Sequence, residues 1–491
     1  MGGSPAQADS AAFGGYPMNK SAKKENNRTL AEMLGATEKE AEELLSVTAL
    51  ITVSQDHDVG VKAAAAIQAL LSRTITGVAV NQPAQEDAVE IVIGAARPSK
   101  DLPHIYVSFV YNTIVVSRTP ETEYSPHPHP IAINIAASYV CGATLKAILG
   151  ERLKYPSSDR VVIDLNALLG GKASLLDRGV VDFGEAFLAG AGAIGNGFVL
   201  GLSVLPLKGI VNVADDDHVS AGNLQRCCYF GEADIGADKA EVLAHRGDLA
   251  CGDRIAFRPH KGLLQSVPQR KDGAWLERLV VAVDSPRARR SLQKELPREV
   301  FDASTTGAEE IVFHFNHQPS DKACMACVYL HTPIEDAREH HVAEALGVSV
   351  NEVKELRVSE RSAESIANKL RIANSAELVG QSYDTLFKNL CGSARVFTPE
   401  GRQVLTPFAF ISTLAGLILA LEFWRRIRCG HGGLFNRWNI SPWANPLLRT
   451  RRELGQNPNC EVCADTNIGP VLHQIWSDAV APRVDQTRAS K

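Results

Sequence analysis

The sequence predicts an α/β protein built on a mostly parallel sheet of the nucleotide-binding type. An apolar strand at residues 186–189, a helix at 196–205 and a second apolar strand at 209–214 follow one another closely. Parallel strands need a crossover helix between them, so this order predicts a Rossmann-like unit. The acidic run 215–217 ends the second strand, where an acid can hold a ribose hydroxyl.

Three glycines, Gly190, Gly192 and Gly195, separate the first strand from the helix. Glycine lets the backbone approach phosphates closely, and the N-terminus of a helix presents free N–H groups and a positive dipole. The pattern alone is weak evidence, because any tight strand-to-helix turn favours glycine. On these residues a nucleotide pocket and a purely structural turn both remain open.

Three motifs beyond the glycine turn favour the nucleotide pocket. Their order and spacing resemble those of the ThiF/MoeB/ubiquitin-activating enzyme superfamily: Asp215-x-Asp217-x-Val219, Asn223-Leu224-Gln225-Arg226 and Asp234-Ile235-Gly236-x-x-Lys239-Ala240. A dehydrogenase has no need of Arg226 and Lys239, whereas a fixed guanidinium and an ammonium neutralise a triphosphate and the charge that develops in adenylyl transfer. Cys227 and Cys228 depart from the family, which has Gln after the arginine.

The resemblance implies an ATP site and assigns its residues. Arg226 and Lys239 are expected to act in catalysis by compensating phosphate charge, and Asp215 to hold the ribose. Asp284 ends a predicted strand at 279–283 and precedes Arg289 as in the family's Asp-x-x-x-x-Arg, so it is the expected magnesium ligand; the plain alternative is an acid that starts a loop. The expected ATP-binding residues are Gly190, Gly192, Gly195, Asp215, Asp217, Asn223, Arg226, Lys239 and Asp284.

Two CxxC pairs, Cys324–Cys327 and Cys460–Cys463, predict a metal site. Each pair presents two thiolates on one side of a tight turn, and two such knuckles complete a closed tetrahedral zinc site. Family members place their zinc pairs in the same way, so the four cysteines are expected to bind a structural zinc ion. A redox role for either pair is the competing interpretation.

A predicted helical insertion lies between the zinc pairs. Its helices are expected at 333–346, at 363–374, at 382–390 and after a capping box at Ser349-x-x-Glu352. It ends at Cys391, shortly before a buried helix at 408–421; thioester-forming relatives carry a reactive cysteine at this place. Cys391 is therefore the expected catalytic nucleophile, with an inert buried cysteine as the alternative and Cys227 and Cys228 as the next candidates.

The N-terminal part shows a second α/β pattern without a glycine fingerprint. Strands are expected at 48–53, 77–80, 88–93 and 105–116, and helices at 28–45 (a pair), 59–71 and 131–149. By the resemblance this part is a degenerate, inactive copy of the adenylation fold that supports the active half; an unrelated substrate-recognition domain is the alternative. His127 and His129 lie in a proline-rich turn, where a surface turn is favoured over a metal site.

Composition sets the broad class. The chain has 491 residues, a net charge of −5 and ten cysteines. These values predict several globular domains, and they argue against a general nucleic-acid binder and against a disulfide scaffold. Residues 1–28 lack the apolar core of a signal peptide and are expected to be a disordered tail. Without a secretion signal, the cysteines suggest a reducing compartment, and the expected location is the cytoplasm. The longest apolar stretch, 408–421, is too short to span a membrane.

The resemblance as a whole is to a ubiquitin-activating-type enzyme, most like bacterial members of phage-defence conjugation operons. The implied reaction is ATP-dependent adenylation of the C-terminal carboxylate of a ubiquitin-like protein, thioester formation on Cys391 and transfer to a conjugating enzyme. A homodimer is left open, and no nucleic-acid or membrane partner is implied. The alternatives are a sulfur-carrier adenylyltransferase of the molybdopterin or thiamine type and a non-catalytic scaffold.

The chain is expected to divide into domains as follows: a tail (1–28), an inactive adenylation-like domain (29–180), an active adenylation domain (181–330 and 401–470), a crossover insertion (331–400) and a C-terminal tail (471–491).

Overall fold

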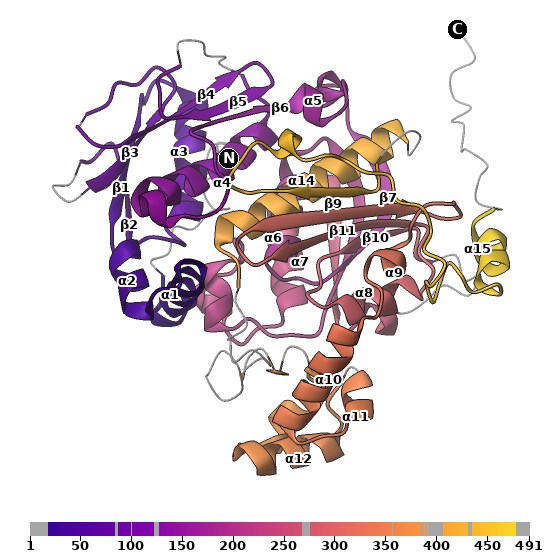
Figure 1. Ribbon diagram of the computed structural model, residues 1–491. Helices are drawn as coiled ribbons and strands as arrows, with labels where there is room; N and C mark the ends of the chain where they lie inside the picture. The colour runs from indigo at the N-terminus through magenta and orange to yellow at the C-terminus, as the bar shows by residue number, and fades with distance from the viewer. Residues whose placement is uncertain are drawn as a thin grey trace, which may run out of the picture.

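The computed structural model consists of two sheets with helices between them and a helical projection (Figure 1). It describes residues 18–83, 87–99, 101–121, 127–267, 275–355, 357–383, 386–387, 390, 406–430 and 435–477.

The first sheet has the strand order β2-β1-β3-β4-β5-β6. β1 pairs in parallel with β2 and β3, and β3 pairs in parallel with β4, whereas β5 runs antiparallel to both of its neighbours. The strands are β1 (Thr48–Val53), β2 (Gly77–Val80), β3 (Asp87–Ile93), β4 (His104–Val110), β5 (Thr113–Ser117) and β6 (Arg160–Asp164).

The second sheet has the strand order β13-β12-β11-β10-β7-β8-β9. β7 to β11 run parallel, and β12 is antiparallel to β11 and β13. The strands are β7 (Val181–Ala189), β8 (Leu207–Asp215), β9 (Ile255–Lys261), β10 (Arg278–Val281), β11 (Glu299–Thr306), β12 (Glu310–His317) and β13 (Arg437–Ile440).

The first sheet repeats the topology of the second with one strand fewer. If β9 is set aside, β8-β7-β10-β11-β12-β13 corresponds strand by strand to β2-β1-β3-β4-β5-β6. The helices correspond as well: α3 (Asp58–Leu71) follows β1 as α6 (Ala193–Val204) follows β7, and α4 (Pro130–Leu149) precedes β6 as α14 (Ala409–Cys429) precedes β13. The expectation of a degenerate copy is confirmed at the level of topology.

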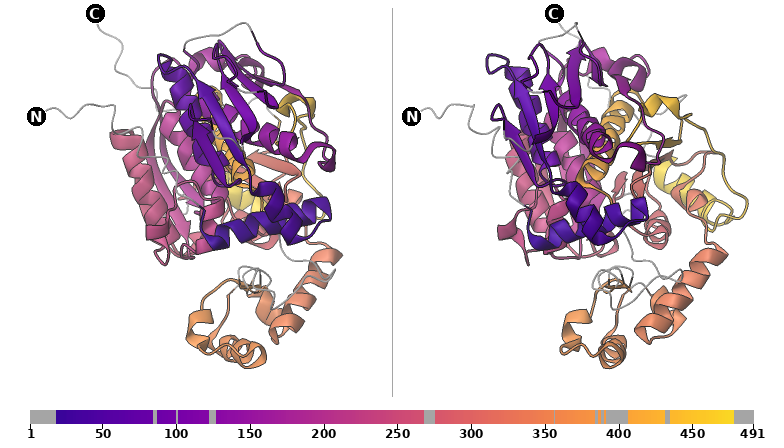
Figure 2. Two further views of the ribbon diagram at one scale, coloured as in Figure 1. Left: turned by 90° about the vertical axis from the view of Figure 1, so that its left-hand side faces the viewer. Right: turned by 60° about the vertical axis from the view of Figure 1, so that its left-hand side comes forward.

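These four helices pack between the two sheets (Figure 2). Residues of both halves belong to one continuous hydrophobic core, so the halves form a single body. α6 and α14 approach closely because small residues face each other: a Cβ on Gly197 would lie 2.8 Å from the Thr413 carbonyl oxygen, and one on Gly201 would lie 2.4 Å from the Ala420 Cβ.

The insertion, residues 331–390, projects from this body and has a hydrophobic cluster of its own (Figures 1 and 2). Its described helices are α10 (Pro333–Leu346), α11 (Val350–Lys354) and α12 (Glu360–Leu370). The predicted capping box at Ser349 and Glu352 is present. The expected helix at 382–390 falls partly outside the described residues.

The remaining helices lie at the edges of the body or near the zinc knuckles. They are α1 (Lys20–Leu34), α2 (Glu38–Leu45), α5 (Leu165–Leu168), α7 (Lys239–Cys251), α8 (Pro286–Gln293), α9 (Met325–Val328) and α15 (Ile468–Ser477).

Several expected boundaries were wrong. α1 begins at Lys20, inside the expected disordered tail, because Asn19 caps it by accepting a hydrogen bond from the Ala22 N–H. The single strand expected at 105–116 is the hairpin β4–β5, which turns at Tyr111 with φ +52°. β6, β11, β12 and β13 were not predicted, and α14 extends well beyond residue 421.

By length and composition, one helix in the described part of the chain could cross a membrane. It spans Pro130–Arg152, and 78% of its most apolar window is buried inside the molecule. The same test is passed by core helices, and this helix packs against α3 and α14.

Candidate nucleotide and metal sites

The glycine turn is shaped by close backbone contacts that leave no room for side chains. Gly190 has φ +101°, and a Cβ there would lie 2.7 Å from the Ala282 carbonyl oxygen at the end of β10. A Cβ on Gly195 would lie 2.3 Å from the Gly190 carbonyl oxygen. Both positions therefore require glycine, and the turn lies directly beside the strand end that leads to Asp284.

The N-terminus of α6 opens toward free space. Gly192 is its N-cap residue, and no described side chain caps it. No described heavy atom lies within 4 Å of the position of a Cβ on Gly192, apart from its chain neighbours. An uncapped helix N-terminus presents N–H groups and positive dipole, so it suits a phosphate group.

The corresponding helix of the first half is closed. The His57 Nδ1 accepts a hydrogen bond of 3.0 Å from the Gly60 N–H at the start of α3. Asn81, just after β2, bonds the Val53 backbone with its side chain, at 2.9 Å to both N and O. A side chain thus caps the helix N-terminus in this half, whereas the second half has no such cap among the described side chains.

Asp215 joins the acidic run to the glycine turn. Its Oδ2 accepts a hydrogen bond of 2.6 Å from the Ala191 N–H, and its Oδ1 accepts one of 2.9 Å from the Asp217 N–H. Burial raises the pKa of Asp215 from 3.8 to about 6, although the positive charge of Lys239 acts in the opposite direction. The carboxylate stands at the end of β8, next to the turn, as the sequence predicts.

Lys239 and Asp217 form the neighbouring ion pair. The Lys239 Nζ lies 2.8 Å from the Asp217 Oδ2, and the Lys239 N–H donates to the Asp217 carbonyl oxygen at 3.0 Å. Burial lowers the pKa of Lys239, but Asp215 and Asp217 outweigh this effect, so its pKa lies above the ordinary value. A charged ammonium group is therefore held beside the glycine turn.

Asn223 and Arg226 lie on or directly after a short 3-10 helix, η4 (Ala221–Gln225). Asn223 caps that helix, with its Oδ1 accepting from the Ser220 N–H at 2.9 Å. The Arg226 Nη1 donates to the Gly222 carbonyl oxygen at 3.2 Å. Burial raises the pKa of the Cys227 thiol, and the positive charges of Arg226 and Lys239 both act against this rise, so the two cations lie near the same thiol.

Asn196 was missed by the sequence analysis and ties η4 to the glycine turn. It is fully buried in the first turn of α6, and its Nδ2 donates to the carbonyl oxygens of Ala191 (3.0 Å) and Gly192 (2.9 Å). Its Oδ1 accepts a hydrogen bond of 3.0 Å from the Tyr229 N–H. The sequence signal that could have identified Asn196 is a single amide side chain in a mostly apolar helix.

Arg73 of the first half was missed as well. It is buried and donates to the carbonyl oxygen of Leu224, within η4, and to those of Cys228 (3.0 Å) and Phe230 (3.5 Å), in the segment after it. Asn26 of α1 joins this contact, donating to the Arg73 carbonyl oxygen at 2.7 Å and accepting from the Gln225 Nε2 at 2.7 Å. The first half thus holds the segment that carries Arg226.

Asp284 is exposed and lies three residues beyond β10 rather than at the strand end. Arg289 holds this loop in place. Its Nη2 donates to the Val283 carbonyl oxygen at 2.5 Å, and its Nε lies 2.8 Å from the Asp302 Oδ1. The Tyr329 hydroxyl donates to the Asp302 Oδ2 at 2.7 Å. The Asp284 carboxylate lies at the edge of the glycine turn and offers oxygen ligands, which are the ligands that a magnesium ion prefers.

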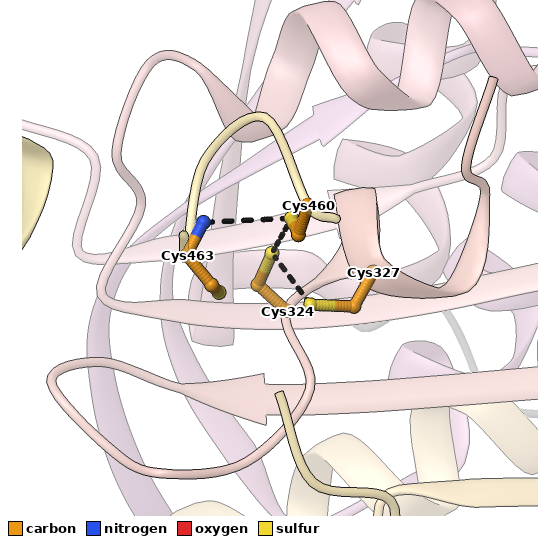
Figure 3. Close-up of side chains that lie close together, drawn as sticks. All are labelled: Cys324, Cys327, Cys460 and Cys463. Atoms are coloured by element: carbon orange, nitrogen blue, oxygen red, sulfur yellow. Dashed lines mark hydrogen bonds between the residues drawn. The ribbon is translucent and has the colours of Figure 1, made fainter. Parts of the chain in front are cut away.

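The two CxxC pairs meet in one cluster (Figure 3). The Cys324 Sγ lies 3.8 Å from the Cys327 Sγ and 3.7 Å from the Cys460 Sγ, and all four sulfur atoms, including that of Cys463, lie within 4.8 Å of one another. Four thiolates around a tetrahedral zinc ion at about 2.3 Å would be roughly 3.8 Å apart. The Cys463 N–H also donates to the Cys460 sulfur at 3.4 Å. The cluster could hold a zinc ion with closed coordination.

The expected nucleophile, Cys391, lies outside the described residues. The next candidates, Cys227 and Cys228, are buried, and burial raises the pKa of both thiols, that of Cys228 to about 12. A buried thiol with a raised pKa is a poor nucleophile, so the structure argues against these two.

A second group of candidate ligands, His331, Asp336 and Glu339, lies at the base of the insertion. Lys354 stands 3.8 Å from the Asp336 Oδ1 and 3.6 Å from the Glu339 Oε2, and Arg287 lies 3.7 Å from the Glu339 Oε1. These cations already compensate the carboxylates, so the group is an ion-pair cluster.

His129 has a structural role at the start of α4. It caps α4, with its Nδ1 accepting a hydrogen bond of 3.3 Å from the Ile131 N–H.

The fold is that of a Rossmann-like α/β domain with a candidate nucleotide site, backed by a closed copy of itself. Residues 18–165 match the E1 N-terminal domain, and residues 181–462 match the ThiF family. The chain belongs to the ThiF family, within the ThiF/E1-type adenylyltransferase superfamily, whose enzymes act on a carrier protein.

Similar proteins include the uncharacterized protein y4jF of Sinorhizobium fredii (strain NBRC 101917 / NGR234). It is 28% identical over 451 residues, which are 85% of this chain and 83% of that protein. Similar solved structures include Escherichia coli MccB with ATP and MccB with succinimide. Each has a TM-score of 0.35 and 14% identity, covering 73% of this chain and 97% of MccB.

Proposed function

We propose that the protein adenylates the C-terminal carboxylate of a ubiquitin-like carrier protein, using ATP. It then holds the carrier as a thioester on Cys391 and passes it to a conjugating enzyme. Membership of the ThiF family supports the adenylation, and the E1 N-terminal domain supports the ubiquitin-activating type. The expected location of this reaction is the cytoplasm.

The contrast between the two helix N-termini carries the proposal. His57 caps α3, whereas α6 begins at Gly192 with no cap among the described side chains. The uncapped N-terminus of α6 would bind phosphate groups together with Lys239, which pairs with Asp217. Asp215, beside the same turn, would accept hydrogen bonds from the ribose hydroxyls. A scaffold without catalysis would have no use for an open N-terminus next to a charged lysine.

In the proposed reaction a carrier carboxylate oxygen attacks the α-phosphorus of ATP. The bond to the bridging oxygen breaks, pyrophosphate leaves, and an acyl-adenylate remains. Lys239 and Arg226 would stabilise the negative charge that builds up on the phosphates, and Asp215 would orient the ribose. Mg²⁺, when bound by Asp284 and the phosphates, would neutralise charge on the leaving pyrophosphate.

The second step would use Cys391. A thiolate attacks the carbonyl carbon of the acyl-adenylate, a thioester forms and AMP leaves. The conjugating enzyme would accept the acyl group on its own thiol by exchange. The four-cysteine cluster would hold zinc as a structural element away from this chemistry.

ATP–pyrophosphate exchange tests the adenylation step. With purified protein, Mg²⁺ and a panel of ubiquitin-like carriers, exchange is expected only when the right carrier is present. Asp284→Ala is expected to abolish it, whereas Asp253→Ala, on a short turn before β9, should leave it unchanged. If no carrier of the panel supports exchange, the non-catalytic scaffold becomes the better account.

Intact mass under non-reducing conditions tests the thioester. A thiol-sensitive adduct of one carrier mass is expected for the wild type and not for Cys391→Ala. An adduct that survives in this variant would assign the nucleophile to another cysteine. Adenylate without any adduct would favour the sulfur-carrier type of enzyme.

The role in bacterial antiviral defence rests only on the resemblance in domain layout. Its test is the plating efficiency of phages on cells that carry the gene with its neighbours. Protection that is lost in Asp284→Ala is expected, and equal plating with and without the gene would argue against this role.

A further inference from the structure

The insertion is attached to the nucleotide-binding half mainly by charged side chains. Its apolar residues form a cluster separate from the main core, and it projects from the body (Figures 1 and 2). A module of this kind keeps its position through the polar contacts at its base. Those contacts therefore decide what the insertion can influence.

Two of the contacts come from α8, the helix that begins directly after Asp284. The Arg290 guanidinium makes a bidentate contact with Glu335 of α10, with both N–O distances 2.7 Å. The Arg287 Nη1 donates to the Val353 carbonyl oxygen of α11 at 2.5 Å. One edge of the nucleotide site is thus joined to the insertion through α8.

The third contact reaches the acidic run itself. The Nη2 of Arg357, between α11 and α12, lies 2.7 Å from the Asp216 Oδ2, and the Arg357 Nη1 donates to the Gly380 carbonyl oxygen within the insertion. The Asp216 side chain is 19% exposed and that of Arg357 is 31% exposed, so the pair is only partly screened by water. Burial raises the pKa of Asp216, and Arg357 is the cation that most strongly opposes this effect.

The three acids of the run are anchored in three directions. Asp215 bonds the glycine turn through Ala191, Asp217 bonds Lys239, and Asp216 bonds the insertion. Asp216 directly follows Asp215, the last residue of β8, so the Asp216 contact restrains the same backbone that carries Asp215. Without Arg357, Asp216 would be a partly buried carboxylate that has lost its ion-pair partner, and it would turn toward water.

We propose that Arg357 is a positioning residue of the nucleotide site. Through Asp216 it holds the acidic run in the orientation that receives the ribose, so ATP binding and docking of the insertion stabilise each other. This inference rests on the proposed function, because it assumes that ATP binds beside Asp215. Coupling between two sites is reciprocal, so the same pair affects both the affinity for ATP and the docking of the insertion.

The experiment is a double-mutant cycle on the full chain with Mg²⁺ and ATP. The variants are Asp216→Asn, Arg357→Gln and the double variant; the control is Arg361→Gln, which removes an exposed arginine of α12. ATP affinity is measured by titration calorimetry. Hydrogen exchange of residues 331–355 and 357–383 is measured with and without nucleotide.

Each single variant is expected to weaken ATP binding about tenfold, and the double variant no more than either single variant. ATP is expected to slow exchange in the insertion of the wild type and of Arg361→Gln, but not in Arg357→Gln. Melting temperatures should stay within a few degrees of the wild type, which separates positioning from a loss of folding.

Three results would overturn the inference. The first is an ATP affinity in Arg357→Gln equal to that of the wild type. The second is a double variant whose loss of ATP affinity is the product of the two single losses. The third is protection of the insertion from hydrogen exchange by ATP that persists in Arg357→Gln. If the wild type binds no ATP in the presence of Mg²⁺, the proposed function fails and this inference fails with it. ATP binding by the wild type together with any of the three results overturns the inference alone.

Discussion

The carboxylate of Asp215 is buried, and burial disfavours its ionised form. Burial raises its pKa to about 6, above the 3.8 of an ordinary aspartate, so the folded protein takes up this proton at higher pH than the unfolded chain does. The stabilisation that this residue gives the fold is therefore fully present below about pH 4 and is lost as the pH rises through about 6. Ribose binding should change in the opposite direction, because only the ionised carboxylate accepts two hydroxyl hydrogen bonds.

We expect the affinity for ATP to fall as the pH drops from 7.5 to 5. One pH unit below a pKa of about 6, roughly one carboxylate in ten stays ionised, so the loss attributable to Asp215 should be about tenfold. Titration of wild type and Asp215→Asn with ATP over this range measures it. The variant should bind weakly at every pH and show a smaller pH dependence; an identical pH dependence in both proteins would contradict the assignment.

At the scale of elements, the packing of α6 on α14 depends on small residues. The Cβ of an alanine at Gly197 would lie 2.8 Å from the Thr413 carbonyl oxygen and 3.2 Å from the Gly416 Cα, both of which are backbone atoms. Rotamer changes cannot relieve such contacts, so the two helices would have to move apart. Since α6 carries the open N-terminus, that movement would also shift the phosphate site.

Gly197→Ala is expected to destabilise the protein by about 1–3 kcal/mol, the usual effect of overpacking a core. Chemical denaturation measures it. The control is Gly469→Ala in α15, where no described heavy atom lies within 4 Å of the new Cβ beyond its chain neighbours, and it should be neutral or slightly stabilising. A Gly197 variant as stable as this control would show that the helices separate without cost.

The zinc cluster is the other element-scale feature with a direct test. Cys460→Ser should remove zinc from the purified protein and lower its melting temperature, because a closed zinc site contributes its binding free energy to the fold. Metal content by mass spectrometry and thermal unfolding measure both effects. Cys429→Ser changes an exposed cysteine outside the cluster and should keep one zinc per chain; equal metal content in the two variants would argue against the cluster.

At the scale of the whole molecule, the first half supports the second through buried polar contacts. Arg73 places its buried guanidinium against carbonyl oxygens of the segment after η4, and Asn26 links it to Gln225. The first half therefore holds the segment that follows η4, beside the candidate nucleotide site, without offering an open helix terminus itself. Its own helix is closed by His57.

Arg73→Met should weaken ATP binding and lower stability by about 3 kcal/mol, because it leaves buried carbonyl oxygens without donors. Lys62→Met, on the exposed face of α3, is the matched control and should behave as the wild type. Calorimetric titration and denaturation measure the two effects. Full ATP affinity in Arg73→Met would show that the halves share a core but not a site.

The local features were predictable because they depend on residues close in the chain. The strand β1 (Thr48–Val53), the helix α10 (Pro333–Leu346) and the capping box at Ser349 appear where the sequence placed them. The strands that were missed belong mostly to the antiparallel edges of the sheets. β6, β12 and β13 are short or lack a regular alternation, and pairing with neighbouring strands of the sheet makes them strands.

The sequence by itself determined the α/β class, the glycine turn with its acid, and the two cysteine pairs, since each is a local pattern with its own chemistry. Tertiary structure decided which residues meet. It placed Asn196 and Arg73 behind the site and joined Arg357 to Asp216. Those contacts connect segments far apart in the chain, and they form because buried polar groups must find partners within the fold, which no local pattern can specify.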